Sequence, residues 1–332
     1  MIKKYLKLAT AGAIILVGGI FLGFLYTKFY PSQATILRLS SENTPSDSVL
    51  SFLNQDVVLK LNKHYIINFL PLKQKLLAIQ KQYPQRTYIY FDYLNNASWI
   101  GLNERELFTA ASTVKVPLAM SLLKAVENEL LKVSDSYALN ELDLDSNFGK
   151  LYKVGKDRQF TVEDLIKIML EQSDNTAMTA IANIMSNIGI TDPLRDVYNY
   201  MGWMSDDLQF IPVMGQSQEL VYQKIDMKIL SNMFLSLYNA NYLNPENSQK
   251  ILSYLANTPF NNKIAAGVPD AVTVAHKIGT SAEDKTFSDC GIIYAPNRNY
   301  LLCLGSNGGD EAKASKFMTE VSKTVYDYVI NK

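Results

Sequence analysis

The sequence predicts an α+β domain in which strands from both ends of the globular region form one sheet. Runs rich in Val, Ile, Thr and aromatic residues at 87–93, 272–277, 289–294 and 300–304 predict strands. A long stretch of helical periodicity separates the first strand from the others. Strands grouped at both ends of a domain, with helices between them, are typical of α+β domains rather than of alternating βαβ units.

The helices are predicted from apolar residues at helical spacing and from helix-start signals. The segment 71–80 is amphipathic and stops near Pro84. Thr161, with Asp164 three residues later, forms a capping pattern at the start of another helix. The remaining helices are predicted over 113–131, 161–172, 228–238, 245–256 and 310–330.

The amino terminus carries a membrane-targeting pattern. Lys3, Lys4 and Lys7 precede an uncharged, mostly apolar stretch at 8–27, which is just long enough to span a bilayer. The small residues Ser32 and Ala34 have the spacing of a signal-peptidase site and allow a cleaved signal peptide instead, but the length of the apolar stretch favours a retained anchor. We therefore expect a single-pass membrane protein whose globular domain is extracytoplasmic, or a secreted protein if the segment is cleaved.

These features divide the chain into three parts. Residues 1–30 are predicted to form the membrane anchor or signal sequence. Residues 31–67 form a linker or extension, because 40–48 is polar and lacks large apolar side chains. Residues 68–332 form the globular domain.

The composition excludes several classes of function. The 32 basic side chains balance the 32 acidic ones, so no charge excess favours nucleic acid as a partner. The chain has only two histidines, His64 and His276, and two cysteines, which leaves almost no choice of side chains for a typical zinc site of three or four nitrogen and sulfur ligands. We expect no metal and no cofactor, and a monomeric protein.

The two cysteines, Cys290 and Cys303, flank a predicted hairpin turn at 296–299. In a hairpin they could lie on the same face. Neighbouring hairpin strands seldom need a covalent bridge, so the pattern disfavours a disulfide without deciding the redox state.

Three short motifs follow one another along the domain: Ser112-Thr113-Val114-Lys115, Ser173-Asp174-Asn175 and Lys277-Ile278-Gly279-Thr280. Each motif is common by chance. The first could be an ordinary helix-surface lysine, the second a helix cap, and the third a strand-edge lysine facing water. Their order argues against coincidence, as does their placement at a helix start, a loop and a strand end.

Ser112 is the candidate nucleophile. It stands at a predicted helix start, where free N–H groups favour a developing alkoxide. Lys115 lies one turn further on the same face and is the candidate base. The pair Ser121 and Lys124 has the same spacing. Ser121 stands nine residues after Ser112, however, and at 100° per residue it lies on the helix face opposite Ser112.

The other two motifs supply candidate binding groups. Ser173 is predicted to pass a proton to the leaving nitrogen, and Asn175 to bind the substrate amide. Asp174 is predicted to orient the loop. Lys277 is predicted to bind a substrate carboxylate at the end of its strand.

Gly279 is predicted to let the substrate approach the edge of this strand. The backbone N–H groups of Thr280 and Ser112 together form a candidate oxyanion hole.

Around these motifs the sequence resembles class A β-lactamases and the wider group of penicillin-recognising serine hydrolases. The resemblance is carried by 108–118, 169–177, 264–269 and 275–280, and it extends over 68–332. It implies a helical subdomain beside a five-stranded antiparallel sheet, with the active site in the groove between them. It also implies covalent catalysis through a serine ester.

The chain departs from the class A pattern at two places. Class A enzymes carry Glu-x-x-Leu-Asn between the second and third motifs, and its glutamate holds the water that hydrolyses the acyl-enzyme. The corresponding stretch 205–215 contains no such element, and Glu219 lies in a different context. Ile278 occupies a position where a hydroxyl is expected, which Thr280 or Ser281 could supply.

The resemblance implies an extracytoplasmic serine hydrolase acylated at Ser112 by a β-lactam or a D-alanyl peptide amide, with slow deacylation. A missing general base typically costs about a hundredfold to ten-thousandfold in rate. The alternatives are a D,D-peptidase-like cell-wall enzyme and a non-hydrolytic sensor of penicillin or cell-wall peptide.

Overall fold

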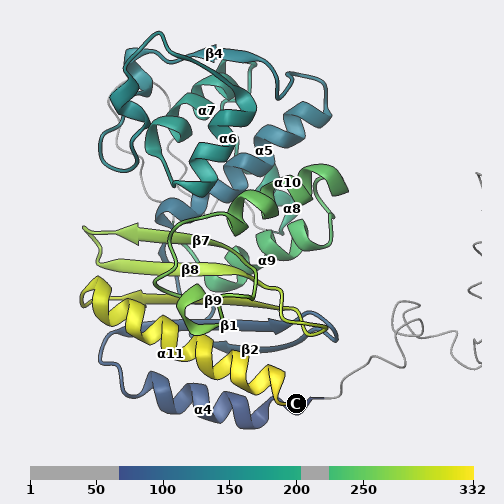
Figure 1. Ribbon diagram of the computed structural model, residues 1–332, viewed down its shortest axis with the longest axis vertical. Helices are drawn as coiled ribbons and strands as arrows, with labels where there is room; N and C mark the ends of the chain where they lie inside the picture. Colours follow the sequence, from purple (N-terminus) through teal and green to yellow (C-terminus); the bar gives the residue numbers. More distant parts are fainter. Residues whose placement is uncertain (1–66, 203–223) are drawn as a thin grey trace, which may run out of the picture. The chain divides into compact units, whose positions relative to one another are not determined.

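In the computed structural model, a five-stranded antiparallel sheet occupies the lower half of Figure 1, with its strands in the order β2-β1-β9-β8-β7. The strands are β1 (Arg86–Tyr93), β2 (Ser98–Leu102), β7 (Val274–Ser281), β8 (Thr286–Ile293) and β9 (Tyr300–Asn307). Along its whole length β1 pairs with β9. The sheet therefore joins the beginning and the end of the domain, which confirms the predicted α+β class and the five-stranded sheet.

The structure describes residues 67–202 and 224–332. The predicted anchor or signal sequence (1–30) and nearly all of the linker (31–67) lie outside these residues. So does the segment 205–219, where the resemblance implies a deacylating glutamate. Within the described ranges, no helix combines the length and the apolar character needed to cross a membrane.

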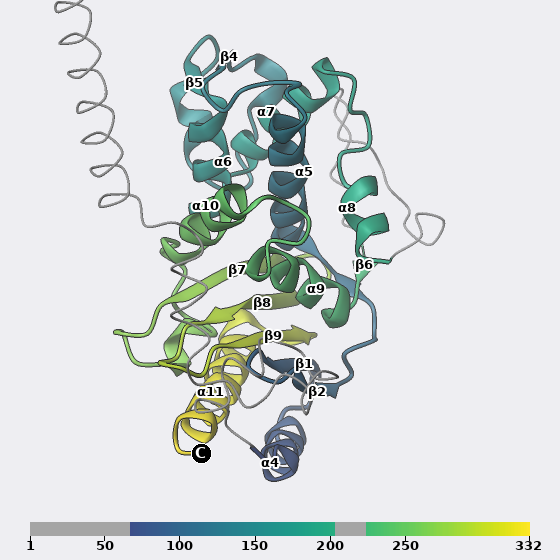
Figure 2. The same cartoon turned by 90° about the vertical axis from the view of Figure 1, so that its right-hand side faces the viewer.

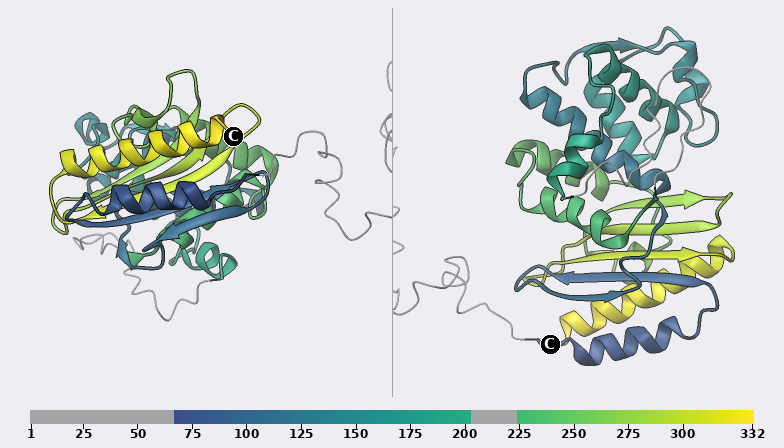
Figure 3. Two further views of the ribbon diagram at one scale, coloured as in Figure 1. Left: turned by 90° about the horizontal axis from the view of Figure 1, so that it is seen from below. Right: turned by 180° about the vertical axis from the view of Figure 1, so that it is seen from behind.

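Helices cover both faces of the sheet. On one face, α4 (Leu70–Gln80) and α11 (Glu311–Ile330) lie side by side, as Figure 3 shows, and their buried apolar side chains share a core with the sheet. On the other face, α9 (Met227–Tyr238) contacts β9, and α10 (Pro245–Ala256) contacts β7 (Figure 2). The ends of these four helices agree with the sequence predictions to within one residue.

A second group of helices lies above the sheet in Figures 1 and 2. It comprises α5 (Lys115–Glu127), α6 (Val162–Glu171), α7 (Asn175–Asn187) and α8 (Arg195–Tyr200). The predicted capping box of α6 is present, because Thr161 and Asp164 each accept a hydrogen bond from the other's backbone N–H at 3.1 Å. The helix predicted over 113–131 is shorter than expected. A 3₁₀ turn (Ala111–Val114) precedes it, and the left-handed backbone of Glu129, at φ 59°, prevents its continuation.

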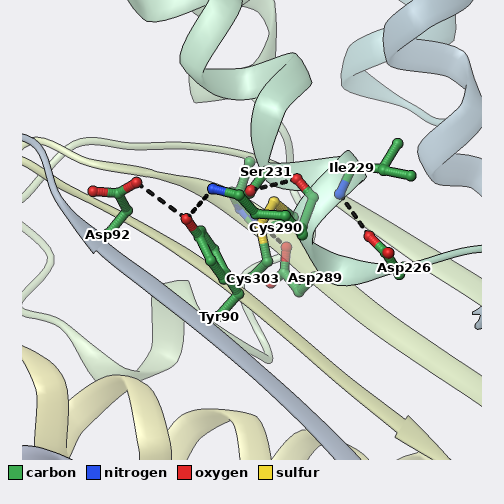
Figure 4. Close-up of a disulfide and its surroundings, with 10 residues drawn as sticks. Tyr90, Asp92, Asp226, Ile229, Ser231, Asp289, Cys290 and Cys303 are labelled. Atoms are coloured by element: carbon green, nitrogen blue, oxygen red, sulfur yellow. Dashed lines mark hydrogen bonds and ion pairs between the residues drawn. A yellow bond between two sulfur atoms is a disulfide. The ribbon is translucent and has the colours of Figure 1, made fainter. Parts of the chain in front are cut away.

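Cys290 of β8 and Cys303 of β9 stand directly opposite each other and are joined by a disulfide (Figure 4). The sequence pattern disfavoured this bridge, and the expectation was wrong. The pairing register also places Lys277 opposite Cys290 and Tyr90 opposite Cys303. Lys277, the two cysteines and Tyr90 therefore form one row across four strands of the sheet.

We expect the purified, unreduced protein to contain no reactive thiol. Since Cys290 and Cys303 are the only cysteines in the sequence, one bridge leaves none free. Alkylation under denaturing conditions should leave the mass unchanged without reductant, and should add two alkyl groups after reduction. Alkylation of the unreduced, denatured protein would contradict the bridge.

Candidate active site

Ser112 is presented by the 3₁₀ turn that joins β3 (Phe108–Thr109) to α5. The turn is closed by Thr113, whose N–H and Oγ1 both donate to the carbonyl oxygen of Ala110, at 3.1 and 2.6 Å. Sequence analysis placed Ser112 at a helix start; the structure places it in the tighter turn immediately before the α-helix. The serine side chain is partly exposed, while the threonine is fully buried.

Lys115, the first residue of α5, connects the first two motifs. Its Nζ donates hydrogen bonds to Ser112 Oγ at 3.0 Å, to Asn175 Oδ1 at 2.7 Å and to the carbonyl oxygen of Ser173 at 2.6 Å. The hydroxyl of Ser173 lies 3.3 Å from the same nitrogen. The amine therefore touches both serine hydroxyls that the predicted chemistry requires.

The environment of Lys115 favours its neutral form. Burial away from water lowers the pKa of its ammonium group from 10.5 to about 7, although the carboxylates of Asp174 and Asp145 oppose that shift. Near neutral pH an appreciable fraction of the side chain is then a free amine. This is the form that can take a proton from a serine hydroxyl.

Ser173 lies at a strained point just before α7. Its backbone adopts φ 55°, in the left-handed region that is uncommon for residues other than glycine. Its buried hydroxyl accepts a hydrogen bond from Lys277 Nζ at 2.7 Å. Ser173 thus lies between the two buried lysines, Lys115 and Lys277.

Asp174 holds the loop around this serine. Its Oδ1 accepts from the N–H of Ala177 at 3.0 Å, which caps α7. Its Oδ2 accepts from the N–H groups of Lys150 and Leu151 at 2.7 and 2.9 Å. Gly149, at φ 99°, lies so close that a Cβ there would overlap the carboxylate. These contacts are with backbone, as expected for a residue that orients the loop.

Lys277 is not at a strand end, as the sequence suggested, but lies within β7, which continues to Ser281. The alternative of a strand-edge lysine facing water is also wrong, because only 1% of Lys277 is exposed. Burial and the neighbouring ammonium of Lys115 together lower the pKa of Lys277 well below its usual value. An anion entering the site would favour the protonated form of Lys277.

Gly279 allows β7 to lie against the Ser112 turn. A Cβ at this position would be 2.9 Å from the carbonyl oxygen of Ala110 and 2.5 Å from Ser288 Oγ. Any larger residue would push the strand away from the nucleophile. Close packing therefore explains the glycine at this position, in addition to the predicted approach of substrate. Thr280 follows it on the same strand and is half-buried.

Sequence analysis missed Asp145. Its Oδ2 lies 3.4 Å from Asn175 Nδ2, yet it belongs to none of the three motifs and stands thirty residues before the asparagine. It lies in an irregular segment just after a 3₁₀ turn (Glu141–Asp143), and no local pattern distinguishes it from a solvent-facing acid.

Behind β7, a second buried pair supports the strand. His276 Nδ1 lies 2.8 Å from Asp289 Oδ1, and the other carboxylate oxygen accepts from the N–H of Ile264 at 3.0 Å. Across the described ranges, no group of three or more His, Cys, Asp or Glu side chains is arranged to hold a metal ion.

Comparison with known proteins gives consistent matches. The family model described as "Beta-lactamase enzyme family" matches residues 71–329. A β-lactamase of Phocaeicola vulgatus is 23% identical over 258 residues, which cover 71% of this chain and 78% of that protein. The solved structure of PBP-A aligns with a TM-score of 0.70 at 20% identity, over 79% of this chain and 97% of its own. A PBP-A variant described as an acyl-enzyme complex with penicillin G gives the same values.

Proposed function

The chain belongs to the β-lactamase enzyme family, and from this premise we propose that it is a serine hydrolase acylated at Ser112 by β-lactams or D-alanyl peptide amides. The observation that carries the proposal is the 3.0 Å hydrogen bond between Lys115 Nζ and Ser112 Oγ, made by a buried amine whose pKa lies about 7. The similarity to a penicillin-bound PBP-A variant is consistent with the substrate class.

The acylation step follows from the contacts of Lys115. The neutral amine takes the proton of Ser112 Oγ while that oxygen bonds to the carbonyl carbon of the substrate. The N–H groups of Ser112 and Thr280 stabilise the oxyanion. The carbon–nitrogen bond then breaks, and the nitrogen takes a proton that passes from Lys115 through the hydroxyl of Ser173, 3.3 Å away.

The charged groups of the site bind and orient the substrate. Lys277 attracts the substrate carboxylate, and its bond to Ser173 Oγ holds that hydroxyl for proton transfer. Asn175 accepts from Lys115 through Oδ1. One N–H of its amide faces Asp145, and the other can donate to the substrate amide.

Deacylation is the slow step of the proposed cycle. The stretch 205–215 contains no Glu-x-x-Leu-Asn element, so no glutamate of that kind is available to activate the hydrolytic water. The second candidate function, a D,D-peptidase-like enzyme or a penicillin sensor, is favoured by this same absence. The two functions differ in the lifetime of the acyl-enzyme.

We further propose that the catalytic domain acts outside the cytoplasm. The apolar segment 8–27, preceded by three lysines, supports export or anchoring. The disulfide between Cys290 and Cys303 supports the same location, because such bridges persist in oxidising compartments.

We expect Ser112→Ala to abolish covalent labelling by β-lactams. Intact-mass spectrometry after incubation with a coloured cephalosporin would show an adduct on the wild-type protein, while absorbance follows turnover. Rapid turnover would support the β-lactamase, and a long-lived adduct the peptidase or sensor. The matched control is Ser121→Ala. Ser121 of α5 has the same spacing to Lys124 as Ser112 has to Lys115, and this variant should keep the adduct. If the wild-type protein forms no adduct and turns over no substrate, the proposed function is wrong.

A further inference from the structure

The carboxylate of Asp145 stands at the end of a hydrogen-bonded chain that leads to the nucleophile. Asn175 Nδ2 donates to Asp145 Oδ2 at 3.4 Å, and Asn175 Oδ1 accepts from Lys115 Nζ at 2.7 Å. Lys115 Nζ in turn lies 3.0 Å from Ser112 Oγ. A carboxylate, an amide, an amine and a hydroxyl thus follow one another in contact.

Asp145 is held in place by the first turn of α7, which also carries Asn175. Its backbone N–H donates to Thr176 Oγ1 at 2.9 Å, and its carbonyl oxygen accepts from that hydroxyl at 3.1 Å. Its Oδ1 accepts from the N–H of Asn147 at 2.7 Å. One carboxylate oxygen therefore fixes the local turn, and the other is left to face Asn175.

This contact decides which end of the Asn175 amide faces Lys115. The amide can bond to the ammonium of Lys115 only through its oxygen, because both the NH₂ group and the ammonium are donors. A carboxylate, which only accepts, holds the NH₂ group on the opposite side. Asp145 therefore selects the amide orientation that gives Lys115 an acceptor.

Asp145 also contributes charge to the surroundings of Lys115. The carboxylates of Asp174 and Asp145 both favour the charged form of this amine. The other basic side chain beside it is Lys277, which contacts the same Ser173 hydroxyl. Both oxygens of Asp174 are occupied by backbone N–H groups of the loop. Asp145 is therefore the carboxylate that is linked to Lys115 by a side chain, the amide of Asn175.

We propose that Asp145 is a positioning residue for the acylation step, acting on Lys115 through the side-chain amide of Asn175. The inference rests on the proposed function, since it assigns a role within acylation of Ser112. It adds a fourth group to the serine, lysine and asparagine of the motifs. The arrangement follows the general logic in which a buried base is oriented by a further group.

The test compares two substitutions across a pH series. Asp145→Asn keeps an acceptor for Asn175 but removes the charge, so Lys115 should lose its proton at lower pH. Below the midpoint of the pH profile, its acylation rate relative to its own plateau should exceed that of wild type by roughly threefold. Asp145→Ala removes the acceptor as well, and its plateau should fall by roughly tenfold.

Acylation is measured in single turnover with a fluorescent penicillin, and thermal unfolding reports whether each variant is folded. The matched control is Glu141→Gln, which removes an exposed charge paired only loosely with Lys156 at 3.9 Å and should leave the profile unchanged. Asp145→Glu retains the charge and should keep the wild-type midpoint, which separates electrostatics from damage to the loop.

The outcomes distinguish this inference from the proposed function. A wild-type protein that acylates, with an unchanged midpoint in folded Asp145→Asn, would overturn the role of Asp145 alone. Equal shifts in Asp145→Asn and Asp145→Glu would overturn it too, since the second keeps the charge. A wild-type protein that neither forms an adduct nor turns over substrate would instead refute acylation of Ser112.

Discussion

Lys115→Ala is expected to abolish acylation of Ser112 while leaving the protein folded. The substitution removes the amine 3.0 Å from Ser112 Oγ, and loss of a general base typically costs about a hundredfold to ten-thousandfold in rate. The fold should survive, because a buried ammonium is costly to keep out of water and its removal offsets the lost hydrogen bonds. Single-turnover labelling measures the rate, and circular dichroism the fold.

The matched control is Lys124→Ala, on the same helix, which alters the lysine that follows Ser121 at the same spacing. Lys124 pairs with Glu127 at 2.6 Å, at the partly exposed end of α5. This variant should acylate at the wild-type rate. If Lys115→Ala acylates at the wild-type rate, another group is the base.

The same residue gives the wild-type reaction its pH dependence. Only the neutral amine accepts a proton, and the pKa of Lys115 is about 7. The acylation rate should therefore fall as the pH is lowered through about 7, and reach a plateau above it. A rate that stays constant across this range would separate Lys115 from the rate-limiting proton transfer.

Asp174→Ala is expected to be the most destabilising single change in the loops around the site. It leaves the N–H groups of Lys150, Leu151 and Ala177 without their acceptor. Each buried donor left unpaired costs about 1–3 kcal/mol, so the free energy of unfolding should fall by roughly 3 kcal/mol or more. Urea denaturation followed by circular dichroism measures the loss.

A matched control separates this effect from ordinary helix capping. Asp310 caps α11 through the N–H of Lys313 at 2.8 Å, on an exposed surface. Asp310→Ala should cost only about 1 kcal/mol, the usual value for one cap. Equal losses in the two variants would mean that Asp174 acts as a cap alone.

The sequence predicted those parts of the fold that depend on local pattern. Helices α4, α9, α10 and α11 show apolar periodicity or clear start signals, and their ends were placed to within one residue. Strand β2 (Ser98–Leu102) was not predicted, because five residues with a glycine among them carry little alternation. The strand is defined by its pairing with β1 rather than by its own composition.

The site was predictable where motifs mark it and unpredictable where tertiary contacts define it. Ser112, Lys115, Ser173, Asn175 and Lys277 were all chosen from the sequence, and hydrogen bonds connect them in the structure. The burial of Lys277 could not be predicted, because it results from β7 packing against the Ser112 turn.

The disulfide and Asp145 escaped prediction for the same reason. The bridge depends on the register that places Cys290 opposite Cys303, which a hairpin of uncertain length does not reveal. Asp145 reaches Asn175 only because the segment after a short 3₁₀ turn folds back onto the start of α7. Neither contact leaves a periodic signal in the chain.

The burial of Lys115 and Lys277 also makes folding a reaction that releases protons. In the unfolded chain both amines keep their protons up to about pH 10.5, whereas in the folded protein the pKa of Lys115 is about 7 and that of Lys277 lies well below 10.5. The folded state therefore binds fewer protons than the unfolded state, and a rise in pH from about 7 towards 10.5 favours folding. The two lysines that the chemistry needs thus reduce the stability of the fold at the neutral pH where the enzyme is expected to act.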